Sequence, residues 1–190
     1  GSMVESVGEY AFCGCSSLEE IPSDLMPVDS KATSVKEMFA ECSSLKSVPS
    51  GLFASTPAVT TFEGTFAECT ALETIPEDLF SAIGTKTSSI TFSECFINCS
   101  ALRNLPAGLF DTVRRINYID SCFEGCSSLT GESPYTIITD AEGAEKKVHL
   151  YERERGDDFP NAPVSASAHA GCFAGCTGLT DYNEMPSDWK

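Results

Sequence analysis

Cysteine is the residue type in this sequence that offers the most chemistry. The chain has ten cysteines, and a cysteine can be a nucleophile, a metal ligand, half of a disulfide or a small apolar core residue. Short Cys-x-Cys and Cys-x₃-Cys spacings make metal binding the first chemistry to test. Four such pairs occur, namely Cys13/Cys15, Cys95/Cys99, Cys122/Cys126 and Cys172/Cys176.

Six of the cysteines belong to an internal repeat. Each has a phenylalanine three residues before it and a leucine three residues after it, and successive cysteines are 27, 27, 30, 27 and 50 residues apart. A fixed period of this length, on which three columns agree, indicates a solenoid. We number the repeats 1 to 6 after Cys15, Cys42, Cys69, Cys99, Cys126 and Cys176.

The remainder of the repeat adds core residues and a turn. In repeats 1 to 4 an aliphatic residue and a proline follow the leucine, and a Leu-Phe or Leu-Met pair comes next. The aliphatic-proline steps are Ile21-Pro22, Val48-Pro49, Ile75-Pro76 and Leu105-Pro106. Near the C-terminus Met185-Pro186 and Trp189 echo this pattern, so we predict that Trp189 covers the end of the stack.

Periodicity predicts the secondary structure of one repeat. Apolar residues at i, i+3, i+4 and i+7 indicate one face of a short helix over residues 35–42 and their equivalents. The Leu-x-x-Ile/Val/Leu-Pro segment predicts a short strand that pairs in parallel with its counterparts in neighbouring repeats, and the proline begins a turn. We therefore predict an α/β, leucine-rich-repeat-like, right-handed solenoid of about six repeats of ~27 residues, with parallel strands on one face and helices on the other.

Residues 131–168 interrupt the array between repeats 5 and 6. The segments 135–140 and 147–155 are β-prone and flank a turn at 141–145, which predicts a β-hairpin. Residues 156–170 predict a returning loop, and residues 177–190 a C-terminal cap, all within one repeat domain spanning 1–190. The hairpin is either a brace packed on the flank of the solenoid or a binding element.

The pattern A/M-F-x-x-C-S/T-x-L-x-x-I-P-x-x-L-F resembles the BspA-like leucine-rich repeats of bacterial surface proteins. The resemblance covers about residues 4–132 and 170–190. It implies an extracellular or cell-surface location and a partner bound on the concave face of the sheet. Core residues define this repeat class, so the resemblance implies no particular ligand.

The repeat pattern argues against two of the four possible roles of the cysteines, metal binding and nucleophilic catalysis. The first cysteine of each Cys-x₃-Cys pair lies in a column that holds Ala11, Met38 and Thr65 in repeats 1 to 3, which marks a packing column rather than a metal site. Burial beside phenylalanine and leucine raises the pKa of a thiol and disfavours nucleophilic catalysis. We expect no catalytic residue, no metal and no cofactor.

Disulfide formation is less settled by the pattern. Ten cysteines and a surface location favour oxidation, whereas side chains of one column run parallel, and a buried free cysteine acts as a small apolar residue. We expect mainly free thiols, with a Cys95–Cys122 bridge, or one between Cys13 and the neighbours of Cys15, as exceptions. At Cys42 we expect serine to destabilise the fold more than alanine, because it buries a hydroxyl.

The charge of the chain narrows the class of partner. Lys and Arg number 12 against 28 Asp and Glu, for a net charge of −16, which excludes nucleic acid and anionic membrane surfaces because both require a cationic face. No apolar run approaches the roughly 20 residues that span a bilayer, so we expect no membrane insertion. The leading Gly1-Ser2-Met3 resembles a cloning remnant, so the absence of a leader gives no information about location.

The function expected from the sequence is non-enzymatic protein binding or adhesion, with a host or bacterial surface protein as the partner. The variable residues after the core leucine are the candidates on the concave face: Glu20, Lys46, Ser47, Glu73, Thr74, Arg103 and Asn104. The hairpin adds Tyr135, His149 and Tyr151, since aromatic residues often anchor interfaces. The alternative is a glycan-binding module, which should show exposed aromatic platforms, or a structural spacer.

Overall fold

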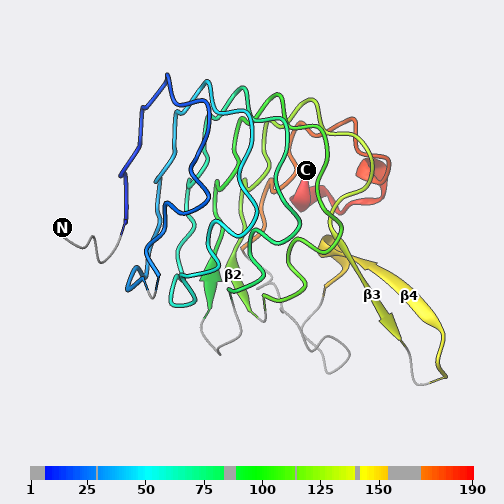
Figure 1. Ribbon diagram of the computed structural model, residues 1–190. Coiled ribbons are helices and arrows are strands. Elements are labelled where there is room, and N and C mark those ends of the chain that lie inside the picture. The colour runs from blue at the N-terminus through cyan, green and yellow to red at the C-terminus, as the bar shows by residue number, and fades with distance from the viewer. Residues whose placement is uncertain (1–6, 29, 84–88, 114, 140–141, 154–167) are drawn as a thin grey trace, which may run out of the picture.

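The chain forms a stack of repeats. The computed structural model describes residues 7–28, 30–83, 89–113, 115–139, 142–153 and 168–190. Figure 1 shows successive turns of the backbone lying side by side from the N-terminal end onward, with a β-hairpin projecting beside the last turns. Such a stack is solenoid-like, and the complete solenoid with its right-handedness stays a prediction.

Regular secondary structure is sparse. Strands β1 (Ile90–Thr91) and β2 (Ile116–Tyr118) pair in parallel. Strands β3 (Tyr135–Thr139) and β4 (Glu145–His149) pair antiparallel, so a hairpin forms as predicted. Its second strand covers 145–149 rather than the predicted 147–155, and the predicted loop at 156–167 lies outside the described residues. The described residues after β4 contain three short 3₁₀ helices, η1 (Leu150–Glu152), η2 (Tyr182–Glu184) and η3 (Ser187–Trp189).

The predicted helices are wrong: the described residues contain no α-helix. In repeat 2 the four residues that suggested a helix are indeed buried, but the backbone around them takes positive φ values at two positions. These positions lie five residues and one residue before every repeat cysteine, and left-handed backbone cannot continue an α-helix. They are Tyr10, Gly14, Glu37, Glu41, Gly64, Glu68, Glu94, Asn98, Ser121, Gly125, Gly171 and Gly175.

Consecutive turns replace the helix. Along this segment alternate N–H groups donate to the carbonyl three residues back, and the others donate to carbonyls of the next repeat. The backbone therefore satisfies its polar groups between repeats as well as within them, as buried N–H and C=O groups require. In repeat 2 the inter-repeat bonds of 2.8–2.9 Å run from Glu37, Phe39 and Glu41 to Glu63, Thr65 and Ala67.

The segments after the core leucine pair in parallel, as predicted, but neighbouring repeats share only one backbone hydrogen bond there among the described residues. The amide of Glu73 donates to the carbonyl of Lys46 at 2.9 Å, and Ser47 and Thr74 form an isolated parallel bridge. A second parallel ladder, eight residues before the cysteine, was not predicted. It contains β1 and β2 and begins with the bridges Ser34–Thr61 and Thr61–Thr91.

The core is built from stacked columns of equivalent side chains. The rings of Phe39, Phe66, Phe96 and Phe123 lie nearly parallel, with successive centroids 5.4 or 5.5 Å apart. All four are fully buried, and burial of one such side chain stabilises the fold by about 1.5–3 kcal/mol. The column continues to Phe173 at 5.4 Å.

The hairpin is inserted into the turn that proline begins. In repeats 3 and 4 the leucine N–H donates to the proline carbonyl, from Leu79 to Pro76 and from Leu109 to Pro106, with two residues between. In repeat 5 the same bond joins Leu150 to Pro134 at 2.8 Å, and residues 135–149 lie between. Leu150 is fully buried, so it takes the core position that leucine holds in the other repeats.

The C-terminal segment closes the stack as the sequence predicts. The N–H of Trp189 donates to the carbonyl of Pro186 at 3.1 Å, which repeats the proline-leucine bond with tryptophan in the leucine position. The indole is 4% exposed and lies 6.2 Å from the ring of Phe173. Trp189 therefore covers the last ring of the phenylalanine column.

Candidate interaction surface

A line of charged side chains crosses repeats 1 to 4 directly after the core leucine. We call Glu19, Lys46, Glu73 and Arg103 the charged row. Neighbouring members are held in register by the single backbone hydrogen bond between repeats. Their side chains are 48–63% exposed, so they face solvent while the leucine before each of the last three is buried.

Charges alternate along the charged row and pair across repeats. Lys46 Nζ lies 2.7 Å from Glu19 Oε2, and Arg103 lies 3.2 Å from Glu73. The hydrogen bond between Lys46 and Glu19 raises the pKa of the lysine and lowers the pKa of the glutamate. Cross-strand pairs of opposite charge support adjacent strands, so these side chains already have partners within the chain.

A second line of exposed polar residues runs beside the first. We call Glu20, Ser47, Thr74 and Asn104 the polar row, and all four are exposed. Both rows thus bring the seven sequence candidates of repeats 1 to 4 onto one surface. Beyond Arg103, the side chains of Thr130 and Thr180 donate to the backbone carbonyls of Arg103 and Gly131, which continues the line without charge.

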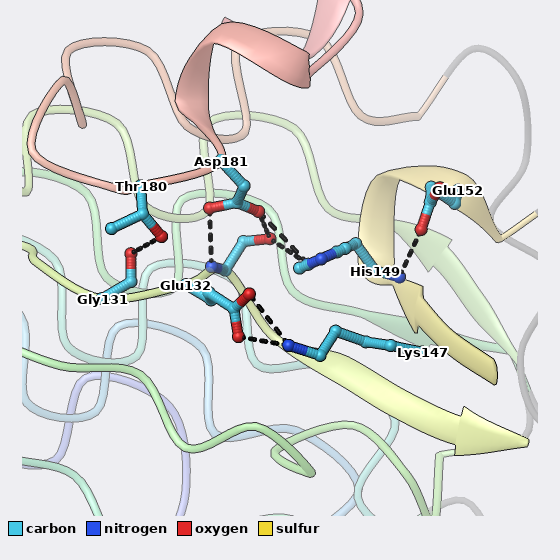
Figure 2. A network of polar contacts seen from close by, with 8 residues as sticks. Gly131, Glu132, Lys147, His149, Glu152, Thr180 and Asp181 are labelled. Atoms are coloured by element: carbon cyan, nitrogen blue, oxygen red, sulfur yellow. Dashed lines mark hydrogen bonds and ion pairs between the residues drawn. The ribbon is translucent and has the colours of Figure 1, made fainter. Parts of the chain in front are cut away.

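Where the rows reach the hairpin, polar side chains become buried. Ser133 donates its hydroxyl to Asp181 Oδ2 at 2.5 Å and its N–H to Asp181 Oδ1 at 3.1 Å. His149 Nδ1 lies 3.2 Å from both the serine Oγ and the aspartate Oδ2 (Figure 2). The three residues come from the start of the insertion, the end of β4 and repeat 6, so the contacts tie the hairpin to the last repeat.

This serine, histidine and aspartate set lacks the geometry of nucleophilic catalysis. A catalytic serine donates its proton to a histidine base that the aspartate orients from the other ring nitrogen. Here Ser133 donates to the aspartate itself, both partners approach the same nitrogen of His149, and the serine is 0% exposed. The arrangement satisfies buried polar groups and holds the hairpin in place.

The three aromatic candidates of the hairpin differ in exposure. His149 is 9% exposed, with its ring stacked on Tyr151 at 5.2 Å, so its side chain offers little surface to a partner. Tyr151 is half-buried against Trp189, and burial together with nearby Asp181 raises the pKa of its hydroxyl. Tyr135 is half-buried as well, with Lys147 Nζ 4.3 Å above its ring.

Lys147 and Glu132 add an ion pair at the base of the hairpin. Lys147 Nζ lies 2.6 Å and 2.9 Å from the two carboxylate oxygens of Glu132 (Figure 2). The hydrogen bond to Glu132 raises the pKa of the lysine. The ammonium group of Lys147 thus contacts both the carboxylate of Glu132 and the ring of Tyr135, and these contacts hold the Lys147 side chain of β4 against the start of the insertion.

The cysteines of repeats 2 to 6 are buried thiols rather than reactive ones, whereas Cys15 of repeat 1 is exposed. All ten cysteines lie among the described residues and are free, including the Cys95 and Cys122 pair considered for a bridge. Burial raises the pKa of Cys42 to about 11 and of Cys69 and Cys176 to about 12. Within the described ranges no group of three His, Cys, Asp or Glu side chains has the arrangement of a metal site.

Each buried repeat cysteine has a partner that the sequence did not reveal. Its S–H donates to the backbone carbonyl of the phenylalanine in the preceding repeat at 3.0–3.2 Å. The expectation that serine destabilises more than alanine assumed a hydroxyl without a partner, and this carbonyl supplies one. The bonds join Cys42 to Phe12, Cys69 to Phe39, Cys99 to Phe66, Cys126 to Phe96 and Cys176 to Phe123.

The second histidine also has a structural place. His169 occupies the column that holds Val35 in repeat 2 and is 8% exposed, with its ring stacked on Trp189 at 4.5 Å. Its Nε2 lies 2.9 Å from Asp188 Oδ2, and this hydrogen bond lowers the pKa of the aspartate. His169 therefore helps to hold the C-terminal segment over the stack.

Comparison with known families agrees with this architecture. The family model described as BspA type leucine rich repeat region (6 copies) matches residues 1–130. The chain belongs to the BspA-type leucine-rich repeat family. The match ends at Thr130, directly before the segment that carries the hairpin.

Family membership supports a general class of function. BspA-type repeats occur in bacterial surface proteins and are typically non-enzymatic modules that mediate protein interactions. No curated protein and no solved structure matches the chain. The part of the chain that the structure describes has no helix that could cross a membrane.

Proposed function

We propose that this chain is a protein-binding adhesion module of a bacterial surface protein, with its partner bound across the charged and polar rows. The exposed face of β3 extends this surface at the end of the stack. The proposed module binds its partner without catalysing a reaction. Its rigid array of repeats presents side chains at fixed spacing, and the partner recognises this arrangement.

The observation that supports the proposal is the contrast between invariant and variable columns. The phenylalanine, cysteine and leucine columns are buried in repeats 2 to 6 and keep one residue type. The two rows beside them differ in charge and size from repeat to repeat, although the backbone holds them at a constant separation. A surface freed from packing in this way can carry recognition while the fold stays the same.

The chemistry of the rows favours a protein partner with mixed charges. A partner must match or displace the pairs between Glu19 and Lys46 and between Glu73 and Arg103. Arginine in such a row is suited to bidentate carboxylate recognition. A glycan site would instead need aromatic platforms, and neither row contains an aromatic residue. Among the large exposed apolar side chains of the described residues, Ile137 on β3 is the one that belongs to the proposed surface, and it is 50% exposed.

A capture experiment with charge-reversed variants tests the proposal. The row variant carries Lys46→Glu, Glu73→Lys and Arg103→Glu. The control carries Lys31→Glu, Glu94→Lys and Arg115→Glu, which makes the same charge change at exposed residues away from the rows. Both variants are compared with the unchanged chain for binding to candidate host and bacterial surface proteins.

The proposal predicts that a bound protein is lost by the row variant and retained by the control. Equal retention by both variants would place the binding surface elsewhere. Binding to a glycan array with no protein ligand would favour the glycan alternative. Circular dichroism of each variant shows whether the fold is kept, so that a loss of binding can be assigned to the surface.

A further inference from the structure

The hairpin has two edges, and the hydrogen bonds at its base show which backbone groups each edge offers. In an antiparallel pair, residues that bond the opposite strand alternate with residues whose N–H and C=O groups point away from it. The N–H of Leu150 donates to the carbonyl of Pro134, so this pair bonds across the hairpin. The N–H of the next residue, Tyr135, donates instead to the carbonyl of Ala107 in repeat 4. Tyr135 therefore begins the outward-pointing set of β3.

The register of the hairpin carries this alternation to the end of both strands. The two strands pair without a shift, so the N–H and C=O groups of Ile137 and Thr139 point outward along the edge of β3. These groups form no hydrogen bond with the residues that the structure describes. The outward residues on the other edge include their partners in the register, Lys147 and Glu145 of β4.

The two edges differ in chemistry. Strand β4 carries Glu145, Lys146 and Lys147, and charged side chains of this kind discourage pairing with a further strand. Strand β3 reads Y-T-I-I-T and contains no charged residue, no proline and no glycine. The side chains of Ile137 and Thr139 are exposed. The edge of β3 thus lacks the features by which proteins usually prevent the addition of a strand.

We propose that the edge of β3 binds an extended, basic segment of a partner protein as an added antiparallel strand. The inference rests on the proposed function, because it specifies how a protein partner engages β3. The backbone of the segment exchanges hydrogen bonds with Ile137 and Thr139, as in other cases where a peptide extends a sheet. The added strand ends before Tyr135, whose N–H is already bonded to Ala107.

An acidic side chain beside this edge specifies the charge of the segment. Asp111 belongs to the same turn as Ala107, since its N–H donates to the carbonyl of Gly108 at 3.0 Å. Its carboxylate accepts from the hydroxyl of Thr136 and lies 3.5 Å from Arg153 Nη2, yet the side chain of Asp111 stays 43% exposed. A lysine or arginine at the end of the segment nearest the stack therefore lies within reach of this carboxylate. The net charge of −16 favours a basic segment as well.

A second copy of this chain fits the edge less well. Strand β3 contains no basic residue, so a second β3 would bring no cation to Asp111. Each copy also carries a net charge of −16, and charge of one sign opposes association. Charge complementarity therefore selects a basic segment of another protein over self-association.

Peptides test the proposal on the unchanged chain. The probe is acetyl-Ser-Thr-Val-Val-Lys-Ser-amide, in which the second and fourth residues lie opposite Thr139 and Ile137 and the lysine lies toward Asp111. One N-methylated form carries methyl groups on the amides of the second and fourth residues, which face β3 and thereby lose their donors. The matched control carries methyl groups on the amides of the third and fifth residues, which face away from β3.

The readout is the amide NMR spectrum of the isotope-labelled chain during titration with each peptide. We expect the amides of Ile137 and Thr139 to shift and those of Lys147 and Glu145 to stay unchanged. The peptide methylated on its second and fourth residues should bind about tenfold more weakly, because two hydrogen bonds are lost, and the control should bind as the probe does. No shift of Ile137 and Thr139 at millimolar peptide, or equal affinity of the two methylated forms, would overturn the proposal.

A proline on either edge provides a second test. Thr139→Pro removes an outward N–H of β3, and Glu145→Pro removes the outward N–H directly opposite, while both spare the N–H groups that join the two strands. Unchanged amide signals of Thr136 and Val148 show that a variant keeps the hairpin. We expect Thr139→Pro to weaken binding of the probe about tenfold or more and Glu145→Pro to leave it unchanged. Equal affinities of the two variants with the hairpin intact would contradict strand addition at β3.

The charge of the segment and self-association are tested with the same materials. A probe with glutamate in place of lysine should bind more weakly, and equal binding would overturn the assignment to a basic segment. We expect the chain to sediment as a monomer. A dimer that Thr139→Pro abolishes would show that a second copy covers the edge, and would also overturn the proposal.

Failure of this inference is separable from failure of the proposed function. The row variant should bind the probe as the unchanged chain does, because its substitutions lie outside the hairpin. If surface proteins are captured through the charged row while the probe leaves Ile137 and Thr139 unshifted, strand addition is overturned and the proposed function stands.

Discussion

Repeats 2 to 4 and the interrupted repeat 5 build the same core from different lengths of chain. Repeats 3 and 4 pass from proline to leucine through two residues, whereas repeat 5 makes the same hydrogen bond across the whole hairpin. The regular repeats are held by apolar columns, while the hairpin is placed by the buried contacts of Ser133, His149 and Asp181. The comparison shows that a repeat tolerates a long insertion between its proline and its leucine when the hydrogen bond between these two residues is kept.

The largest effect should come from breaking a column inside the regular repeats. Phe66→Ala removes a fully buried ring that stacks on Phe39 and Phe96. Large-to-small changes of buried phenylalanine cost about 3–5 kcal/mol of unfolding free energy. Urea unfolding followed by circular dichroism measures this loss, and a loss below 1 kcal/mol would show that the column is not the main source of stability.

The equivalence of the two kinds of repeat is tested by the paired changes Leu109→Ala and Leu150→Ala. Both leucines are 0–1% exposed and occupy the same place after proline. Each change should cost about 2–5 kcal/mol by leaving a cavity, and the two losses should agree within about 1 kcal/mol. If Leu150→Ala were nearly neutral, the hairpin segment would be an attachment to the stack rather than part of repeat 5.

A smaller and more local effect is expected from Asp181→Ala. The change leaves the N–H and hydroxyl of buried Ser133 without their acceptor and should cost about 1–3 kcal/mol. Hydrogen exchange of β3 and β4 should become faster while exchange in repeats 2 to 4 stays the same. The exposed Asp24 supplies the control, and Asp24→Ala should alter neither region.

If Asp181→Ala accelerated exchange throughout the stack, the polar contacts would be supporting the whole array. The regular repeats and the hairpin would then depend on the same polar contacts, contrary to the comparison made above for the apolar columns and the hairpin. If exchange of β3 and β4 did not change, the hairpin would be held by Leu150 and its neighbours alone.

The smallest effect concerns the cysteine column. Cys69→Ser and Cys69→Ala should differ in unfolding free energy by no more than about 1 kcal/mol, because a serine hydroxyl can donate to the carbonyl of Phe39 as the thiol does. Parallel urea titrations of the two variants measure the difference. A serine variant that is several kcal/mol less stable than alanine would mean that this carbonyl does not accept the new hydroxyl.

Much of the fold could be predicted from the sequence because burial leaves a periodic record. The columns of Phe39, Cys42 and Leu45, the proline turn, the hairpin and the place of Trp189 all follow from repeated residue types. The backbone conformation was wrong because consecutive turns bury the same i, i+3, i+4 and i+7 positions as a short helix. Glycine or asparagine occupies half of the twelve positive-φ positions. This recurrence is the sequence signal that distinguishes consecutive turns from a short helix.

The candidate site could be predicted only where it belongs to the repeat. Lys46 and Arg103 were placed on one exposed surface by their position after the core leucine, but their acidic partners in adjacent repeats were not anticipated. Ser133 and Asp181 were missed because they are 48 residues apart and meet only through the insertion. Residue type alone predicts His149 as a surface contact, whereas its neighbours bury it.

The central claim is that the cysteines of repeats 2 to 6 are packed core thiols, which leaves the exposed rows as the proposed binding surface. Thiol titration of the native chain, followed by titration in denaturant, tests it most directly. We predict that Cys13 and Cys15 react quickly, that the eight buried cysteines react only on unfolding, and that all ten thiols are recovered. Several additional fast-reacting cysteines, or fewer than ten thiols in denaturant, would contradict this account.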